Sequence, residues 1–171
     1  MLFRSLAWEV TAQGHTVRAE RVLLATNAYQ TALTGPAPSY TVVHYSQFAT
    51  TPLPPELRKT LLPGGEGCWD TALVMSSIRM DQAGRLIFGG MGDVMGPGAK
   101  VHQAWAKAKL ASLFPELGPV TFEHIWQGRI AMTSDHIPKA LAFGPNALAL
   151  FGYSGRGIAP GTVLGQAAAE T

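Results

Sequence analysis

The sequence LALFGYSGRGIAP, residues 148–160, decides how the end of this chain folds. Its apolar start at 148–151 is typical of a buried strand, and Pro160 suits the first turn of a helix, where its missing N–H would have no partner. The glycine-rich turn between them is therefore expected to present a helix N-terminus. Its free N–H groups can hold a phosphate, a carboxylate or the electron-rich edge of a ring. A strand-to-helix connector that binds nothing is the alternative.

Short strands precede this turn along most of the chain. Apolar and polar residues alternate on both sides of Gly14, which predicts a hairpin from residues 8–11 and 16–19. The apolar run at 21–26 is expected to form a strand buried on both faces of a parallel or mixed sheet. Further strands are predicted at 40–49, 71–80, 85–91, 120–130, 139–143 and 147–151, with a tight turn at 81–84 joining the second and third of these.

Two helices are predicted. One covers 160–170, and the other covers 101–114 and ends before Pro115. The interior helix is expected to turn Lys100, Lys107 and Lys109 outward and to pack through Val101, Ala104, Trp105, Ala108, Ala111 and Ser112. Glycine and prolines at 34–39 predict a connector. Because the strands are mostly antiparallel and the helices are segregated from them, the fold class is α+β.

Composition narrows the class of protein. Of 171 residues, 47% are hydrophobic and only 14% are charged, so either the surface is unusually neutral or part of it is normally covered. The formal net charge is +2 without a basic stripe, which favours neither nucleic acid nor a membrane as a partner. No apolar run reaches the roughly 18 residues that span a bilayer. A single cysteine, Cys68, excludes an internal disulfide and fits a cytoplasmic location.

Other motifs fail on inspection. Arg156 stands where a nucleophile elbow, G-x-S-x-G, requires glycine. The glycines at 90–96 are wrongly spaced for a dinucleotide-binding fingerprint, and Pro97 blocks the helix that must follow it. The five histidines lack metal-ligand spacing, so no metal site is expected.

A series of short motifs covers almost the whole chain in order: LATNAY at 24–29, ATTPL at 49–53, GRLIFGG at 84–90, LFPEL at 113–117, WQGR at 126–129, TSDHIP at 133–138 and GYSGRG at 152–157. Together they resemble the C-terminal half of the FAD-dependent D-amino-acid oxidase, glycine oxidase and sarcosine oxidase family. Within that family the series is most similar to the gamma-glutamylputrescine oxidases.

The resemblance implies a flavoenzyme that oxidises a C–N bond of an amine or amino acid to an imine by hydride transfer to FAD. A helix N-terminus aimed at the flavin would stabilise its reduced, negatively charged edge. The positions that match cofactor-binding segments of the family are Ala25, Thr26, Asn27, Gly128, Arg129, Ser154, Gly155, Arg156, Gly157 and Ile158. Among them, the backbone donors expected at the flavin are Gly155, Gly157 and Ile158.

Departures from the family pattern refine the expectation. Sarcosine oxidases attach the flavin to a cysteine near the position of Gly128, so FAD is expected to be non-covalent here. Ala159 stands where those enzymes have a lysine that binds the substrate carboxylate, which favours an amine over a small α-amino acid. Arg156 replaces the usual histidine of the turn. No general base is assigned, because alternation does not tell which face of the sheet His44, Tyr45 and Arg79 occupy.

The motifs also imply an organisation in three parts. Residues 1–39 match the end of an FAD-binding domain, 40–125 a substrate domain and 126–171 a return to the FAD-binding domain. The G-x-G-x-x-G unit of the family is not found in the 171 residues, so the chain is expected to be a C-terminal fragment whose partner is the missing N-terminal FAD-binding half. Two alternatives stay open: a non-catalytic remnant or module that pairs with a separate nucleotide-binding chain, and a dehydrogenase that uses an acceptor other than oxygen.

Overall fold

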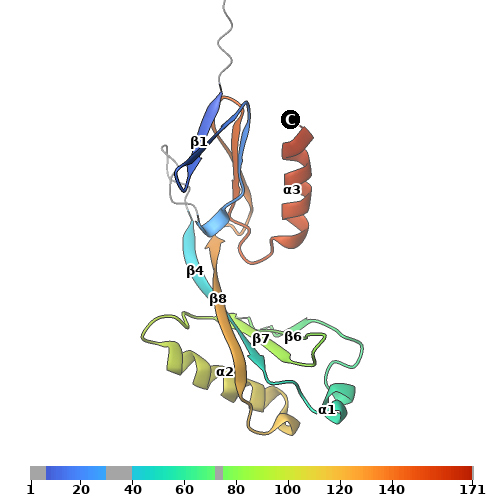
Figure 1. Ribbon diagram of the computed structural model, residues 1–171. Coiled ribbons are helices and arrows are strands. Elements are labelled where there is room, and N and C mark those ends of the chain that lie inside the picture. Colours follow the sequence, from blue (N-terminus) through green and yellow to red (C-terminus); the bar gives the residue numbers. More distant parts are fainter. Residues whose placement is uncertain (1–6, 30–39, 72–74, 171) are drawn as a thin grey trace, which may run out of the picture. The chain divides into compact units, whose positions relative to one another are not determined.

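The computed structural model describes residues 7–29, 40–71 and 75–170, which form two compact units (Figure 1). Unit 1 combines Met1–Val42 with Ile130–Thr171, and unit 2 is Val43–Arg129. Helices and antiparallel strands are both present, in agreement with the α+β class. The predicted three-part division at 39 and 125 stays a prediction.

Unit 1 contains a hairpin and a small mixed sheet. The hairpin is formed by β1 (Trp8–Ala12) and β2 (His15–Ala19). Its turn residues, Gln13 and Gly14, both have positive φ (49° and 79°), the geometry that matches the twist of paired strands. The predicted hairpin is therefore confirmed. The indole of Trp8 packs against Phe143, with ring centroids 5.5 Å apart.

The mixed sheet of unit 1 has the order β3-β10-β9. Strand β3 (Val22–Leu24) runs parallel to β10 (Ala147–Phe151), whereas β9 (Lys139–Gly144) is antiparallel to it. Helix α3 (Ile158–Glu170) follows β10. The expectation of a strand buried on both faces at 21–26 is wrong, because β3 is an edge strand of three residues with Leu23 45% exposed.

Unit 2 is built on a five-stranded sheet of order β5-β6-β7-β4-β8. Its strands are β5 (Cys68–Trp69), β6 (Ser77–Met80), β7 (Leu86–Met91), β4 (Thr41–Thr50) and β8 (Phe122–Met132), and the last two reach beyond the unit boundary. Pairings β5–β6, β6–β7 and β7–β4 are antiparallel. The tight turn at 81–84 joins β6 to β7 as predicted. Part of the strand predicted at 71–80, residues 72–74, and the connector at 34–39 lie outside the described residues.

Short elements of unit 2 and unit 1 were not predicted. Helix α1 (Pro55–Thr60) begins at a proline, a residue well suited to a first helical turn. The two-residue strand β5 and the 3-10 turns η1 (Asn27–Tyr29) and η2 (Pro115–Leu117) are too short for a periodic pattern to reveal.

Helix α2 (Ala99–Leu113) covers one face of the sheet in unit 2. The side of the helix that faces the sheet differs from the predicted side. Its buried residues are Ala106 and Leu110, whereas Val101 is 70% exposed. Lys109 is partly buried because it pairs with Asp70 at 3.0 Å. Alanines lie on both the buried and the exposed side of this helix, so their positions do not indicate which side packs against the sheet. The large side chains decide it. Of the expected inward set, only Trp105 joins the core.

The core of unit 2 is aromatic. Phe48 and Phe88 are fully buried, and their neighbours are Phe122, at 5.0 Å from Phe48, and Trp105, at 5.4 Å from Phe88 between ring centroids. Gly90 lies beneath the Trp105 ring. Among the described residues, no helix is long and apolar enough to cross a membrane.

Gly90→Ala should destabilise unit 2, because a Cβ there would lie 2.6 Å from two ring atoms of Trp105. Overpacking of this kind costs about 1–3 kcal/mol of unfolding free energy. Gly67→Ala is the control, since a Cβ at Gly67 meets nothing within 4 Å, and it should change stability by less than about 0.5 kcal/mol. Urea unfolding followed by tryptophan fluorescence measures both. Equal values for the two variants would contradict the packing described.

Candidate functional site

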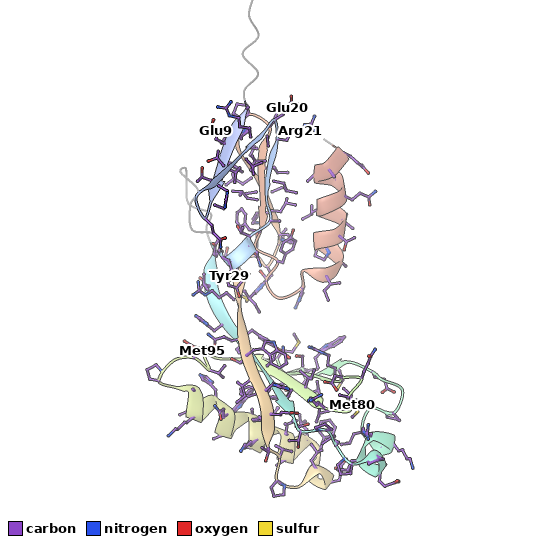
Figure 2. The ribbon with its side chains drawn as sticks, viewed as in Figure 1. Glu9, Glu20, Arg21, Tyr29, Met80 and Met95 are labelled. Atoms are coloured by element: carbon purple, nitrogen blue, oxygen red, sulfur yellow. The ribbon has the colours of Figure 1, made fainter. Side chains whose placement is uncertain are left out.

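Two of the predicted cofactor segments follow neighbouring parallel strands. Leu24, the last residue of β3, pairs with Ala149 of β10. Residues 25–27 continue from β3, and the turn at 152–157 continues from β10. The carboxyl ends of parallel strands meet at one edge of a sheet, which is where open α/β sheets bind ligands. Figure 2 shows Arg21 and Tyr29, which precede and follow β3, at opposite ends of unit 1, with Tyr29 at the end to which β3 leads.

The turn after β10 has a backbone that requires glycine. Gly152 and Gly155 have φ of +78° and +82°, and Ser154 between them has φ of +50°. A Cβ at Gly152 would lie 2.5 Å from the methyl group of Thr133, so this position has no room for a side chain. A Cβ at Gly155 would meet only the Ile130 side chain at 3.8 Å, so its outer side is open to an approaching group.

Three N–H groups of this turn are bound within unit 1. Ser154 N–H donates to Ala131 O at 3.1 Å and Arg156 N–H to Tyr153 O at 2.9 Å. Gly152 N–H donates to the side-chain oxygen Oδ1 of Asn27 at 3.0 Å. These bonds fasten the turn to the sheet and to the end of β3.

Three other N–H groups are left for a ligand. No acceptor is found within the described part of the chain for the N–H of Gly155, Gly157 or Ile158. Ile158 is the first residue of α3, a helix of 13 residues, so these donors gather at the positive end of the helix dipole. They are the backbone donors that the sequence predicted, and free N–H groups at a helix N-terminus can hold an anion or another electron-rich group.

A buried pair of hydroxyls supports the turn from within unit 1. Ser154 and Thr133 are 8% and 3% exposed, and their oxygens lie 3.3 Å apart. Ser154 Oγ also accepts from Thr133 N–H and donates to Gly152 O, each at 3.2 Å. The Ser154 side chain and N–H are thus both engaged in holding the turn, and the contact of Ser154 with a cofactor stays a prediction.

The remaining predicted cofactor residues are placed as follows. Ala25, Thr26 and Arg156 are exposed beside the turn or within it, and Asn27 is half-buried. Gly128 and Arg129 lie on β8 in unit 2, half-buried and exposed respectively, and their role toward a cofactor stays a prediction.

Unit 2 carries a polar sheet face that the sequence did not assign. The register of the strands places Trp69, Ser77, Gly89 and Gln47 in one row across β5, β6, β7 and β4. Since neighbouring Phe88 points to α2, this row lies on the opposite face. Side-chain atoms of Ser77, Gln47 and Tyr45 occupy the space over Gly89 that a Cβ would fill.

The groups on this polar face include one unsatisfied acceptor. Tyr45 Oη donates to Ser77 Oγ at 3.0 Å. Gln47 Oε1 is buried and has no hydrogen-bond partner among the described residues. Arg79, two residues from Ser77 on β6, shares the face.

His44 lies on the other face of β4 from Tyr45. Its Nδ1 is hydrogen-bonded to Gln127 Nε2 at 3.1 Å, and Gln127 Oε1 accepts from Val94 N–H at 2.7 Å. The structure therefore answers the question that alternation left open: Tyr45 and Arg79 share a face, and His44 belongs to the side that carries the helix.

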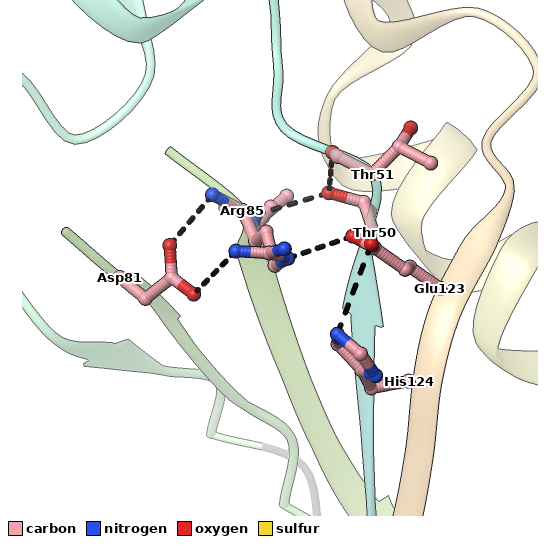
Figure 3. A network of polar contacts seen from close by, with 7 residues as sticks. Thr50, Thr51, Asp81, Arg85, Glu123 and His124 are labelled. Carbon is pink, nitrogen blue, oxygen red and sulfur yellow. Dashed lines mark hydrogen bonds and ion pairs between the residues drawn. The ribbon is translucent and has the colours of Figure 1, made fainter. Parts of the chain in front are cut away.

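A second polar cluster in unit 2 is structural (Figure 3). Arg85 Nε donates to Glu123 Oε2 at 2.8 Å, and its guanidinium lies 3.7 Å from Asp81. The hydrogen bond with Glu123 raises the pKa of Arg85, and the same bond lowers the pKa of Glu123. Nearby, Thr50 Oγ1 accepts from Leu86 N–H at 3.0 Å. These contacts join the β6–β7 hairpin to β8 and β4. Because the side chains of the cluster bind one another or the backbone, we assign them a structural role.

In the described ranges, no group of three or more His, Cys, Asp or Glu side chains could hold a metal ion. The candidate features are therefore two, each described by itself: backbone donors in unit 1, and a polar sheet face in unit 2.

Comparison with known proteins shows the family to which the chain belongs. Residues 3–171 match the family described as FAD dependent oxidoreductase (DAO). The chain belongs to this family, and FAD is the family's cofactor.

Particular relatives are two proteins named probable oxidoreductase OrdL. The one from Rhizobium meliloti (strain 1021) is 31% identical over 157 residues, which are 91% of this chain and 36% of the relative. The one from Haemophilus influenzae is 28% identical over 167 residues, 95% of this chain and 38% of the relative. The chain thus spans little more than a third of these relatives.

Solved structures share the fold. L-proline dehydrogenase from P. horikoshii has a TM-score of 0.63 at 18% identity, over 87% of this chain and 41% of that one. A thermally stable mutant of fructosyl peptide oxidase has a TM-score of 0.62 at 15% identity, over 86% of this chain and 40% of that one.

Asp135, in the loop that supports Thr133, is expected to titrate with a pKa of about 2, below the ordinary 3.8, because Lys139 and the Ile137 N–H both bind its carboxylate. Since the folded pKa is the lower one, the stability from this carboxylate is complete above the unfolded pKa and is lost as the pH falls through about 2. The carboxyl-carbon NMR shift of Asp135 measures the midpoint. Lys139→Gln should raise it, and an unmoved midpoint would exclude the lysine as the main cause.

Proposed function

We propose that this chain supplies the flavin-facing turn and the substrate-facing sheet of an FAD-dependent oxidoreductase that oxidises the C–N bond of an amine or amino acid to an imine. The observation that carries the flavin part is the cluster of unpaired N–H groups at Gly155, Gly157 and Ile158, at the edge where β3 and β10 end. Family membership supports the redox class.

FAD, when bound, would supply the acceptor for the hydride, a hydrogen with its bonding electron pair, that leaves the substrate carbon. The chain's own contribution is electrostatic: the N–H groups at the start of α3 would hold the ring edge that gains negative charge. These donors are fixed in place before any ligand arrives, so no reorganisation is required during the reaction. No side chain is assigned as a general base.

For the substrate we propose an amine, held on the polar face of unit 2. Gln47 Oε1 is buried without a partner among the described residues, and an ammonium group would satisfy it once the side chain turned its oxygen outward. Trp69, 70% exposed at the end of the same row, offers an aromatic face to a cation or an alkyl chain. Ala159 in the flavin turn lacks the charge that would hold a small amino acid by its carboxylate. The resemblance to gamma-glutamylputrescine oxidases supports the same choice.

Arg79 is the observation that favours an amino acid instead. Its guanidinium is the positive group on the polar face and would suit a carboxylate.

For the partner we propose a nucleotide-binding half that carries a G-x-G-x-x-G unit and holds the pyrophosphate of non-covalent FAD. The proportion of each relative that this chain matches, 36% and 38%, supports it. We further propose a cytoplasmic location, on the strength of the single free Cys68.

The flavin-facing role predicts which amides respond to FAD. In NMR spectra of the chain, FAD should shift the amide signals of Gly155, Gly157 and Ile158. Ile158→Pro removes one donor at a first helical position that tolerates proline, and should weaken FAD binding about tenfold, the effect of about 1.4 kcal/mol. Ile158→Ala, the control, removes a 92% exposed side chain but keeps the N–H, and should leave binding unchanged. Absence of shifts in the turn at saturating FAD would contradict the proposal.

The amine proposal predicts which ligand reaches the polar face. Butylamine should shift the amide signals of Gln47, Ser77 and Gly89, and Gln47→Leu should weaken this binding about tenfold by removing the charge-assisted hydrogen bond. Butyrate, of similar length but opposite charge, is the matched control. Shifts with butyrate alone, abolished by Arg79→Gln, would favour the amino-acid alternative.

A further inference from the structure

We infer that Asn27 is a positioning residue, which shapes the flavin-facing turn through Gly152 instead of binding the cofactor itself. That the turn faces a flavin rests on the proposed function. The hydrogen bond between Asn27 and Gly152 does not, because it lies within the chain and needs no ligand.

The first step is the conformation of Asn27. Its φ is +46°, a left-handed value that β-branched and bulky residues avoid and that asparagine tolerates better than most. It is the first residue of η1 and follows the end of β3 by three positions. This backbone turn directs the side chain from the end of β3 toward the end of β10.

The second step is the partner. Asn27 Oδ1 accepts the N–H of Gly152 at 3.0 Å, a bond between residues 125 positions apart. Gly152 is buried and directly follows the last residue of β10. At this point the chain leaves the sheet with φ of +78°, so no neighbouring strand can take its N–H. Asn27 supplies the acceptor that the sheet does not.

The third step is the geometry that depends on it. The turn is held on one side by Thr133 and Ser154 and on the other by Asn27. The open stretch with the unpaired N–H groups of Gly155 and Gly157 follows directly after these two fastenings, at residues 152 and 154. Without Asn27, the backbone at Gly152 would no longer be held in one direction. The N–H groups of Gly155 and Gly157 would then no longer share one orientation. Oδ1 is engaged by Gly152, so a direct contact with a cofactor would use Nδ2; we assign Asn27 to the turn.

Two substitutions separate the hydrogen bond from the backbone conformation. Asn27→Gly accepts the left-handed φ without strain but removes the acceptor. Asn27→Asp keeps an acceptor in the same place and also tolerates the conformation, but lacks the amide nitrogen that a cofactor contact would use. The full 171-residue chain is used in each case, at ~0.5 M salt so that the added charge of aspartate is screened.

Hydrogen exchange of the Gly152 amide is the first measurement. Exchange should be at least about tenfold faster in Asn27→Gly than in the unaltered chain, and nearly unchanged in Asn27→Asp, since tenfold corresponds to the loss of a single hydrogen bond. The Leu150 amide within β10 is the control, and its protection should be equal in all three chains. Equal acceleration at Leu150 and Gly152, or no acceleration at Gly152, would overturn the inference.

The second measurement is the response of Gly155, Gly157 and Ile158 amides to FAD. The shifts should be lost in Asn27→Gly and retained in Asn27→Asp. Loss in both variants with normal Gly152 protection in Asn27→Asp would show that Asn27 binds the cofactor directly, and would overturn the positioning role. FAD shifts confined to amides outside the turn in the unaltered chain would overturn the proposed function, while the exchange data would still decide whether Asn27 fastens the turn.

Discussion

The parallel pairing of β3 with β10 is the constraint on which the candidate flavin site depends. It joins Leu24 to Ala149, residues from the two ends of the chain, and so brings the segments that follow both strands to one sheet edge. An antiparallel pairing would place those segments at opposite edges. The Asn27–Gly152 hydrogen bond and the Thr133–Ser154 hydroxyl pair then fix the turn after β10. The donors at the start of α3 are the result of this placement.

Local signals were sufficient for most of the strands and for the turn itself. Gly14 and the tight turn at 81–84 identify hairpins because their conformations are set by neighbours in sequence. The same is true of the donors at Gly155 and Gly157, since a glycine-rich turn before Pro160 defines a helix start without information from elsewhere in the chain. The family resemblance added the cofactor, which the match over residues 3–171 confirms.

Features that depend on packing across the chain could not be predicted. Alanines around α2 left its buried side undefined until Trp105 and Leu110 met the aromatic core. Alternation along β4 separated His44 from Tyr45, but only the contact between Phe88 and Trp105 shows which face carries the helix. The side chain of Asn27 reaches a partner 125 positions away, and no pattern near Asn27 indicates that contact.

The low charge of the chain acquires a physical reason from where its exposed apolar side chains lie. Ile158 and Val163 are exposed on α3 in unit 1, and Trp69 and Val101 are exposed in unit 2. Exposed apolar groups of this size are costly in water when they gather into patches, and such patches usually mark an interaction surface. Edge strand β3 adds a backbone without a second strand partner among the described residues. A nucleotide-binding half that covers such groups would remove both costs, whereas a chain working by itself would retain them.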